Sequence, residues 1–161
     1  VDMSLAALFG KPPRMVRNVR RRARTAQPLS LDGIELREAC YRVLRAPTGE
    51  VVLLLNEREQ WELPGGRIEL GESSTECLAR EIAEELNLRV EVGAPIDTYL
   101  FEVVPGKHVF IATYDCTLVG AFAPVVSHEH KRLGLFAPDA LPMNLPGGYR
   151  ASIAAACNRN P

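Results

Sequence analysis

The chain of 161 residues contains no apolar run that approaches the length of a membrane span, so we expect a soluble protein. It also lacks closely spaced cysteines, because Cys40, Cys77, Cys116 and Cys157 lie far apart in the sequence. This spacing argues against a cysteine metal knuckle and favours free thiols in a reducing cytoplasm. Internal repeats and low-complexity tracts are absent as well. A single domain with a real hydrophobic core fits this length.

Positive charge is scarce outside the first 28 residues. Seven of the 19 lysines and arginines lie in residues 1–28, which leaves 12 basic and 19 acidic side chains for the rest. We therefore predict a basic, flexible arm over residues 1–28 and an acidic domain over residues 29–161. The arginine run could bind RNA, but one run without interleaved aromatics is more typical of a solvated tail than of a nucleic-acid-binding arm.

The domain alternates strand-like runs with turn signals. Residues 36–44 and 51–55 have strand character and flank a Pro-Gly turn, so we predict that they pair as a hairpin. Further strands are expected at 88–92, 97–104, 109–119 and 133–136, and 97–104 should pair with 109–119 across the turn at 105–107. A closing helix is expected at 149–157. The pattern predicts a mixed sheet between helices.

One stretch, residues 66–88, organises the rest of the chain. Neither glycine nor proline interrupts residues 74–86, and most of these residues favour the helix. Ser73 followed by Glu76 predicts a capping box, in which each side chain bonds the backbone N–H of the other residue. Asn87 stands where a helix often ends in a left-handed residue, a conformation that asparagine tolerates.

The predicted helix separates into two faces. Four apolar residues form one stripe suited to packing on a sheet: Leu78, Ala79, Ile82 and Leu86. Glu81, Glu84 and Glu85 gather on an adjacent arc, where their charges repel one another. A hard divalent cation such as Mg²⁺ removes this conflict, because it prefers carboxylate oxygens. An ordinary solvated acidic face is the alternative interpretation.

The spacing of these residues resembles the Nudix box, the signature of MutT-like pyrophosphohydrolases. The box places a glycine, a glutamate, an arginine and three further glutamates at fixed offsets. The matching positions here are Gly66, Glu72, Arg80, Glu81, Ile82, Glu84, Glu85, Asn87 and Leu88. Asn87 stands where the family usually has glycine, and we expect it to be a mild replacement because both residues tolerate positive φ.

The resemblance implies an α/β fold, an α/β/α sandwich with a mixed sheet. It implies hydrolysis of a pyrophosphate bond in a nucleoside diphosphate linked to another group, with Mg²⁺ as cofactor and Mn²⁺ as a substitute. By resemblance, the metal ligands are Glu81, Glu85, Glu84 and Glu72, with the Gly66 carbonyl completing the shell. The partner would be a small nucleotide-type substrate, and dimers are frequent in the family. Neither a membrane nor a nucleic acid is an expected partner.

The remaining catalytic roles are expectations of the same kind. Arg80 would orient Glu72, and the general base would be Glu84 in the box or Glu129 in the loop before the last strand, with Glu102 as a weaker candidate. Arg67 follows the glycine turn, where a cation could meet phosphate. Trp61 could stack a nucleobase, as could Tyr99, Phe101 and Phe110, although aromatic residues in strands more often belong to the core.

Two other hypotheses stay open at this point. A Nudix-like module could bind a nucleotide or a protein without hydrolysis, but all four box glutamates are present, which favours an enzyme. His128 and His130 flank Glu129 and suggest zinc, yet two histidines without a third clear ligand more often only line a loop. The identity of the substrate is not set by these residues.

Overall fold

The computed structural model describes residues 29–31 and 34–159, and the predicted arm at 1–28 lies outside this range. Eight strands and two helices are present in the described residues. In chain order they are β1 (Leu29–Leu31), β2 (Ile34–Val43), β3 (Val51–Leu55), β4 (Trp61–Glu62), β5 (Gly65–Arg67), α1 (Ser74–Leu86), β6 (Arg89–Val104), β7 (Lys107–Val119), β8 (Arg132–Phe136) and α2 (Gly147–Arg159).

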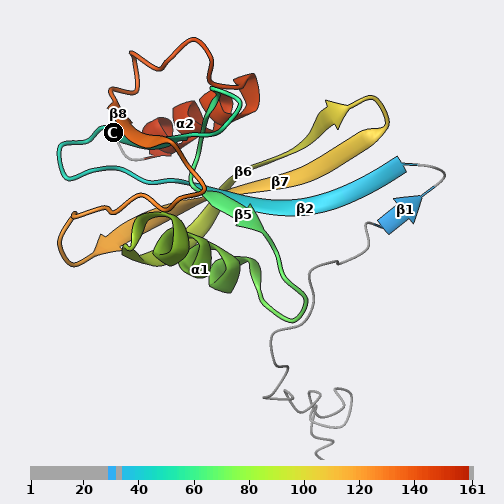
Figure 1. Cartoon of the computed structure of the whole chain (residues 1–161), viewed down its shortest axis with the longest axis horizontal. Helices are drawn as coiled ribbons and strands as arrows, with labels where there is room; N and C mark the ends of the chain where they lie inside the picture. The colour runs from blue at the N-terminus through green and yellow to red at the C-terminus, as the bar shows by residue number, and fades with distance from the viewer. Residues whose placement is uncertain (1–28, 32–33, 160–161) are drawn as a thin grey trace, which may run out of the picture.

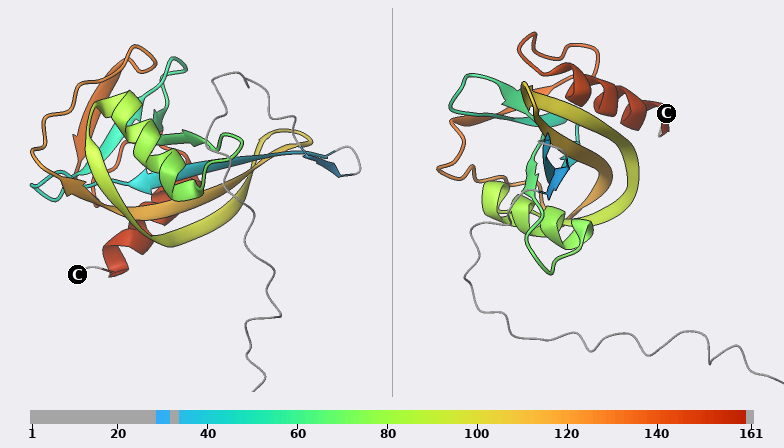
Figure 2. Two further views of the ribbon diagram at one scale, coloured as in Figure 1. Left: turned by 90° about the horizontal axis from the view of Figure 1, so that it is seen from below. Right: turned by 90° about the vertical axis from the view of Figure 1, so that its right-hand side faces the viewer.

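The strands form two sheets. The larger has the order β1-β2-β7-β6 with β5 paired to β2, and the smaller has the order β4-β3-β8. Strands β2 and β7 run parallel while every other pair in the described residues is antiparallel, so the larger sheet is mixed. Helices α1 and α2 lie on opposite sides of the strands (Figures 1 and 2). The predicted α/β/α sandwich with a mixed sheet is confirmed.

The predicted hairpin between residues 36–44 and 51–55 is wrong. Strand β2 pairs with β1, β5 and β7, whereas β3 pairs with β4 and β8 in the other sheet. The two regions share an isolated bridge between Arg45 and Val51 and the hydrogen bond from the Val52 N–H to the Leu44 carbonyl, but no strand ladder. The reason is the apolar run of β3, which is buried along its whole length. A strand that is apolar on both faces needs cover on both, and a central position between two cores provides it.

Those two cores are separated by β3. Val51, Leu53 and Leu55 face a cluster that includes residues of α2, while Val52 and Leu54 face a cluster that includes Ile82 and Leu86 of α1. Alternate side chains of a strand point to opposite faces, so five consecutive residues serve both cores. The chain thereby fixes α1 and α2 relative to one another through one short strand.

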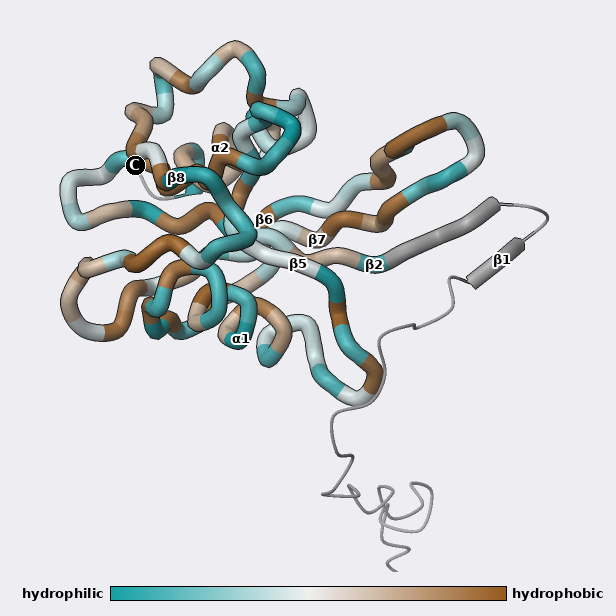
Figure 3. Tube along the Cα trace, in the orientation of Figure 1, coloured by the Kyte–Doolittle hydropathy of each residue, from teal (hydrophilic) through white to brown (hydrophobic). Residues whose placement is uncertain are grey.

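Strand β6 runs further than predicted, from Arg89 through Pro95 to Val104, with register shifts around Pro95. It is an edge strand of the larger sheet, which explains why a proline is tolerated within it. Strands β6 and β7 form the predicted hairpin. Near its turn, Val103 and Val104 remain exposed, and Figure 3 shows this hydrophobic end of the hairpin.

Helix α1 begins and ends as the sequence predicts. Ser73 and Glu76 form the complete capping box, and Asn87 takes the left-handed conformation with φ 54° and ψ 33°. Its buried face differs in part from the predicted stripe, because Ala79 is exposed whereas Cys77 and Glu85 are buried. The helix is therefore rotated about its axis so that Glu85, rather than Ala79, faces the interior.

A buried arginine of β2 lies beneath this helix. Arg42 is fully buried, and its guanidinium donates a hydrogen bond to the Leu78 carbonyl of α1. Burial lowers the pKa of Arg42 to about 10.

Within the described residues, no helix is long and apolar enough to cross a membrane.

The left-handed conformation of Asn87 predicts how this position responds to substitution. Asn87→Ala should lower the free energy of unfolding by about 1 kcal/mol, because a β-carbon disfavours the left-handed region. Asn87→Gly should leave it unchanged or raise it slightly. Urea unfolding of the three proteins measures this. Asn158→Ala, the same change within the exposed part of α2, is the control, and equal effects at both positions would contradict the prediction.

Candidate active site

The guanidinium of Arg80 lies among three carboxylates of the 66–88 stretch. It contacts Glu72 at 2.8 Å, Glu81 at 2.9 Å and Glu84 at 3.2 Å, and it also donates to the Arg67 carbonyl. The hydrogen bond from Arg80 lowers the pKa of Glu72. A planar group with five N–H donors can bond several acceptors at once, so one arginine holds Glu72 against the helix.

Glu85 is the most deeply buried of these carboxylates, with 4% of the residue exposed. It accepts a hydrogen bond from the Gly65 N–H at 3.0 Å, and its Oε1 lies 3.6 Å from Nε2 of His130. Burial raises its pKa to about 8, against the opposing effects of His130 and of the Gly65 bond. Burial also raises the pKa of Glu81. The protein alone thus stabilises the ionised form of both carboxylates poorly.

The glycine turn is shaped to admit these side chains. Gly65 has a φ of 144°, and a β-carbon there would collide with the backbone of Cys40 and Tyr41 in β2. A β-carbon on Gly66 would instead meet the carboxylate of Glu81. The turn therefore needs two glycines for two reasons, close packing on β2 and room for Glu81.

This arrangement fits a hard divalent cation. Glu81 and Glu85 point toward the glycine turn, and a desolvated pair of carboxylates with few N–H donors is the ligand chemistry that Mg²⁺ and Mn²⁺ use. In this structure Arg80 bonds the carboxylates of Glu72, Glu81 and Glu84. Among the described residues, no three His, Cys, Asp or Glu side chains lie close enough together to hold a metal ion. Glu81 and Glu85 are the two carboxylates whose placement beside the glycine turn fits such a cation.

The loop before β8 lies against the C-terminal end of α1. The Ser127 N–H donates to the Glu85 carbonyl, and the Val125 N–H donates to the Leu86 carbonyl. Glu129 in this loop is exposed, and its charge is one of the causes that raise the pKa of Glu81. The loop that carries Glu129 is thus bonded to the last turn of α1, as the general-base hypothesis requires. Glu102 instead accepts a bond from Gly106 in the β6–β7 turn.

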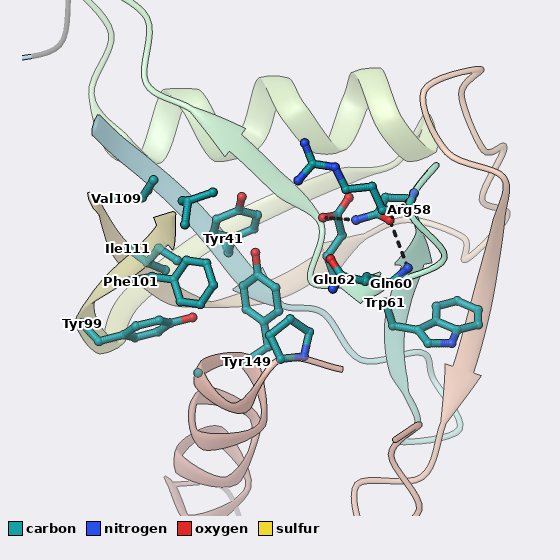
Figure 4. A pocket seen from close by; sticks show the side chains of 14 residues that line it. Tyr41, Arg58, Gln60, Trp61, Glu62, Tyr99, Phe101, Val109, Ile111 and Tyr149 are labelled. Carbon is teal, nitrogen blue, oxygen red and sulfur yellow. Dashed lines mark hydrogen bonds between the residues drawn. The ribbon is translucent and has the colours of Figure 1, made fainter. Parts of the chain in front are cut away.

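A pocket of about 250 Å³ is lined in part by Glu62, which contacts the same His130 ring that lies near Glu85. Aromatic rings from three elements line it, those of Tyr41, Tyr99, Phe101 and Tyr149, together with the polar side chains of Asn56, Arg58, Gln60 and Glu62 (Figure 4). Tyr41 and Tyr149 meet edge to face, with ring centroids 5.1 Å apart. The pocket combines apolar, aromatic walls with a polar side, as small-molecule sites commonly do.

Only some of the aromatic residues expected to stack a nucleobase line the pocket. Tyr99 and Phe101 line the pocket, but Phe110 does not. Trp61 lines it too, yet the residue is only 6% exposed and its ring packs on Phe136 and under Arg132, away from Tyr99 and Phe101 (Figure 4). Its stacking surface is therefore used within the protein. The side chain of Arg67 is exposed beside the glycine turn.

Sequence reasoning missed several residues of this region, namely Tyr41, Asn56, Glu62 and Tyr149. Their side chains come from separate elements, so no local spacing connects them. For Glu62 there was a signal, since it stands three residues before Gly65 and directly after Trp61 in the stretch that leads to the turn.

The profile that describes the NUDIX domain matches residues 36–155. The chain belongs to the Nudix family. Among curated relatives, a Bacillus subtilis protein named "Putative 8-oxo-dGTP diphosphatase" is 39% identical over 62 residues. That match covers 32% of this chain and 42% of the relative, so it spans less than half of the relative's length.

Solved structures of Nudix proteins share the fold. The MutT protein from Methanosarcina mazei Go1 superposes with a TM-score of 0.72 and 25% identity, over 82% of this chain and all of that one. A MutT Nudix hydrolase from Burkholderia pseudomallei gives a TM-score of 0.67 and 26% identity, over 75% of this chain and 98% of that one. The Nudix resemblance seen in the sequence is confirmed.

The close approach of Gly66 to Glu81 predicts a specific effect. If Glu81 is a metal ligand, Gly66→Ala should weaken Mg²⁺ binding about 10–100-fold, because the new methyl group would displace the Glu81 carboxylate. It should leave the fold intact, since the displaced atoms end a flexible side chain. Calorimetric titration measures the affinity. Gly147→Ala is the matched control, since its β-carbon would meet open space, and equal affinities for both variants would contradict the prediction.

Proposed function

We propose that this Nudix protein is a metal-dependent pyrophosphohydrolase, which cleaves a pyrophosphate bond in a nucleoside diphosphate linked to another group. The single observation that carries the proposal is the connection between the aromatic pocket and the carboxylates of α1. Glu62 lines the pocket and contacts His130, and His130 also lies beside Glu85. A nucleobase in the pocket would bring its phosphates to the box.

The proposed metal ligands are Glu81 and Glu85, with Glu72, Glu84 and the Gly66 carbonyl as further donors. When bound, Mg²⁺ would neutralise phosphate charge and favour attack by water. Arg80 holds the box carboxylates in place, and the exposed cation of Arg67 is available to the phosphates.

Glu129 is the general base that we favour, with Glu84 as the alternative within the box. Attack of a water oxygen on phosphorus forms one P–O bond and breaks the P–O bond to the bridging oxygen. The proton of the water passes to the Glu129 carboxylate. The place of Glu129 on a loop bonded to the end of α1, together with the effect of its charge on the pKa of Glu81, supports this role.

Nucleoside triphosphates are the substrates that we propose, including the oxidised 8-oxo-dGTP that appears in the name of the curated relative. The aromatic walls of the pocket suit the flat base that every nucleotide carries, and the name of that relative is what favours triphosphates among nucleotides. We place the reaction in the cytoplasm, where the four free thiols of the chain would stay reduced.

The test is hydrolysis of a panel of nucleoside triphosphates, nucleotide sugars and dinucleotides, with and without Mg²⁺. We expect Mg²⁺-dependent turnover of triphosphates, lowered about 10²-fold or more in Glu85→Gln because a metal ligand is lost. Glu57→Gln, a change at an exposed residue, should behave as wild type.

Each other result has a definite meaning. Turnover of nucleotide sugars alone would contradict triphosphates as the substrate class but would still support pyrophosphate hydrolysis as the reaction. Binding of nucleotides without turnover of any panel member would instead support the non-catalytic module.

A further inference from the structure

His130 joins the pocket to the box carboxylates. Its ring is almost fully buried, with 8% of the side chain exposed. Nε2 lies 3.0 Å from Oε1 of Glu62 and 3.6 Å from Oε1 of Glu85. One nitrogen atom therefore stands between a carboxylate of the pocket wall and a carboxylate of α1.

The two carboxylates are otherwise held by separate parts of the chain. Glu62 belongs to β4, and its Oε2 accepts a hydrogen bond from the Asn56 amide at 3.1 Å. Asn56 in turn accepts the N–H groups of Arg58 and Gln60, which fixes the loop between β3 and β4. Glu85 belongs to α1 and accepts from Gly65. The His130 ring therefore contacts both Glu62 of β4, which follows this loop, and Glu85 of α1.

The backbone on both sides of His130 is anchored. The Ser127 N–H donates to the Glu85 carbonyl at 2.9 Å, and the Lys131 N–H donates to the Leu55 carbonyl at 2.8 Å. The imidazole thus starts from a position that β3 and α1 set together. A side chain with a fixed origin and a buried ring can define the distance between its two partners.

His128 offers an informative contrast. It lies two residues away in the same loop and is exposed. A surface role for the whole loop would not bury one histidine between two carboxylates and leave the other in solvent. Nor do the described residues offer a third ligand that would make a zinc site of the pair.

We propose that His130 is a positioning residue, which holds Glu62 of the pocket in register with Glu85 of the box so that the bound base and the scissile phosphates are aligned together. This inference rests on the proposed pyrophosphohydrolase activity. Misplacement of reacting groups by about 1 Å can lower a rate about 10²-fold, so a residue that sets this register acts chiefly on kcat.

The test compares His130→Ala, His130→Gln and His128→Ala, using the fastest-hydrolysed triphosphate of the panel and its α,β-methylene analogue. His130→Ala should lower kcat about 10–100-fold with a smaller change in KM. His130→Gln keeps an N–H donor and should recover part of the loss. His128→Ala should match wild type. Urea unfolding first establishes that each variant is folded under the assay conditions.

A double-mutant cycle separates this role from a merely structural one. If His130 acts through Glu62, then Glu62→Gln and His130→Ala should not be additive in kcat/KM, nor in the calorimetric affinity for the analogue. Additive effects, or a folded His130→Ala variant indistinguishable from His128→Ala, would overturn the inference. A wild type without turnover of any panel member would instead overturn the proposed function and this inference with it.

Discussion

The burial of the Glu85 carboxylate against the glycine turn is the constraint on which the rest of the structure depends. A carboxylate that is withdrawn from water is destabilised unless donors or cations surround it. Here the nearby partners are one N–H of Gly65 and the imidazole of His130, and burial still raises the pKa of Glu85 to about 8. The apolar face of α1 must compensate for this, and Ile82 and Leu86, both fully buried, do so beside it.

The fold provides what that placement requires. The capping box fixes the start of α1, and Asn87 ends it in the left-handed conformation just after Glu85 and Leu86. Strand β3 separates the two cores, so α1 and the pocket-lining end of α2 are positioned from the same five residues. The candidate site then lies where the two sheets, α1 and the loop before β8 meet, and the contacts of Glu85 with Gly65 and of His130 with Glu62 and Glu85 cross between these parts.

The sequence predicted what local spacing encodes. Ser73 with Glu76, the left-handed Asn87 and the hairpin of β6 and β7 all depend on residues close in the chain, and each is present. The predicted hairpin of β2 and β3 failed because burial on both faces of β3, a tertiary property, decided its partners. Glu62 and His130 stand 68 residues apart, and the rings of Tyr41 and Tyr149 come from distant elements. Only the folded chain brings these side chains together.

The central claim is that Glu81, Glu85 and the glycine turn hold a divalent cation. The most direct measurement is paramagnetic broadening of assigned backbone amide signals when Mn²⁺ is added to the ¹⁵N-labelled protein. The account predicts that the strongest broadening centres on Gly65, Gly66, Glu81 and Glu85, and weakens with distance from them. Broadening centred on another acidic region, or spread evenly over the surface, would contradict it.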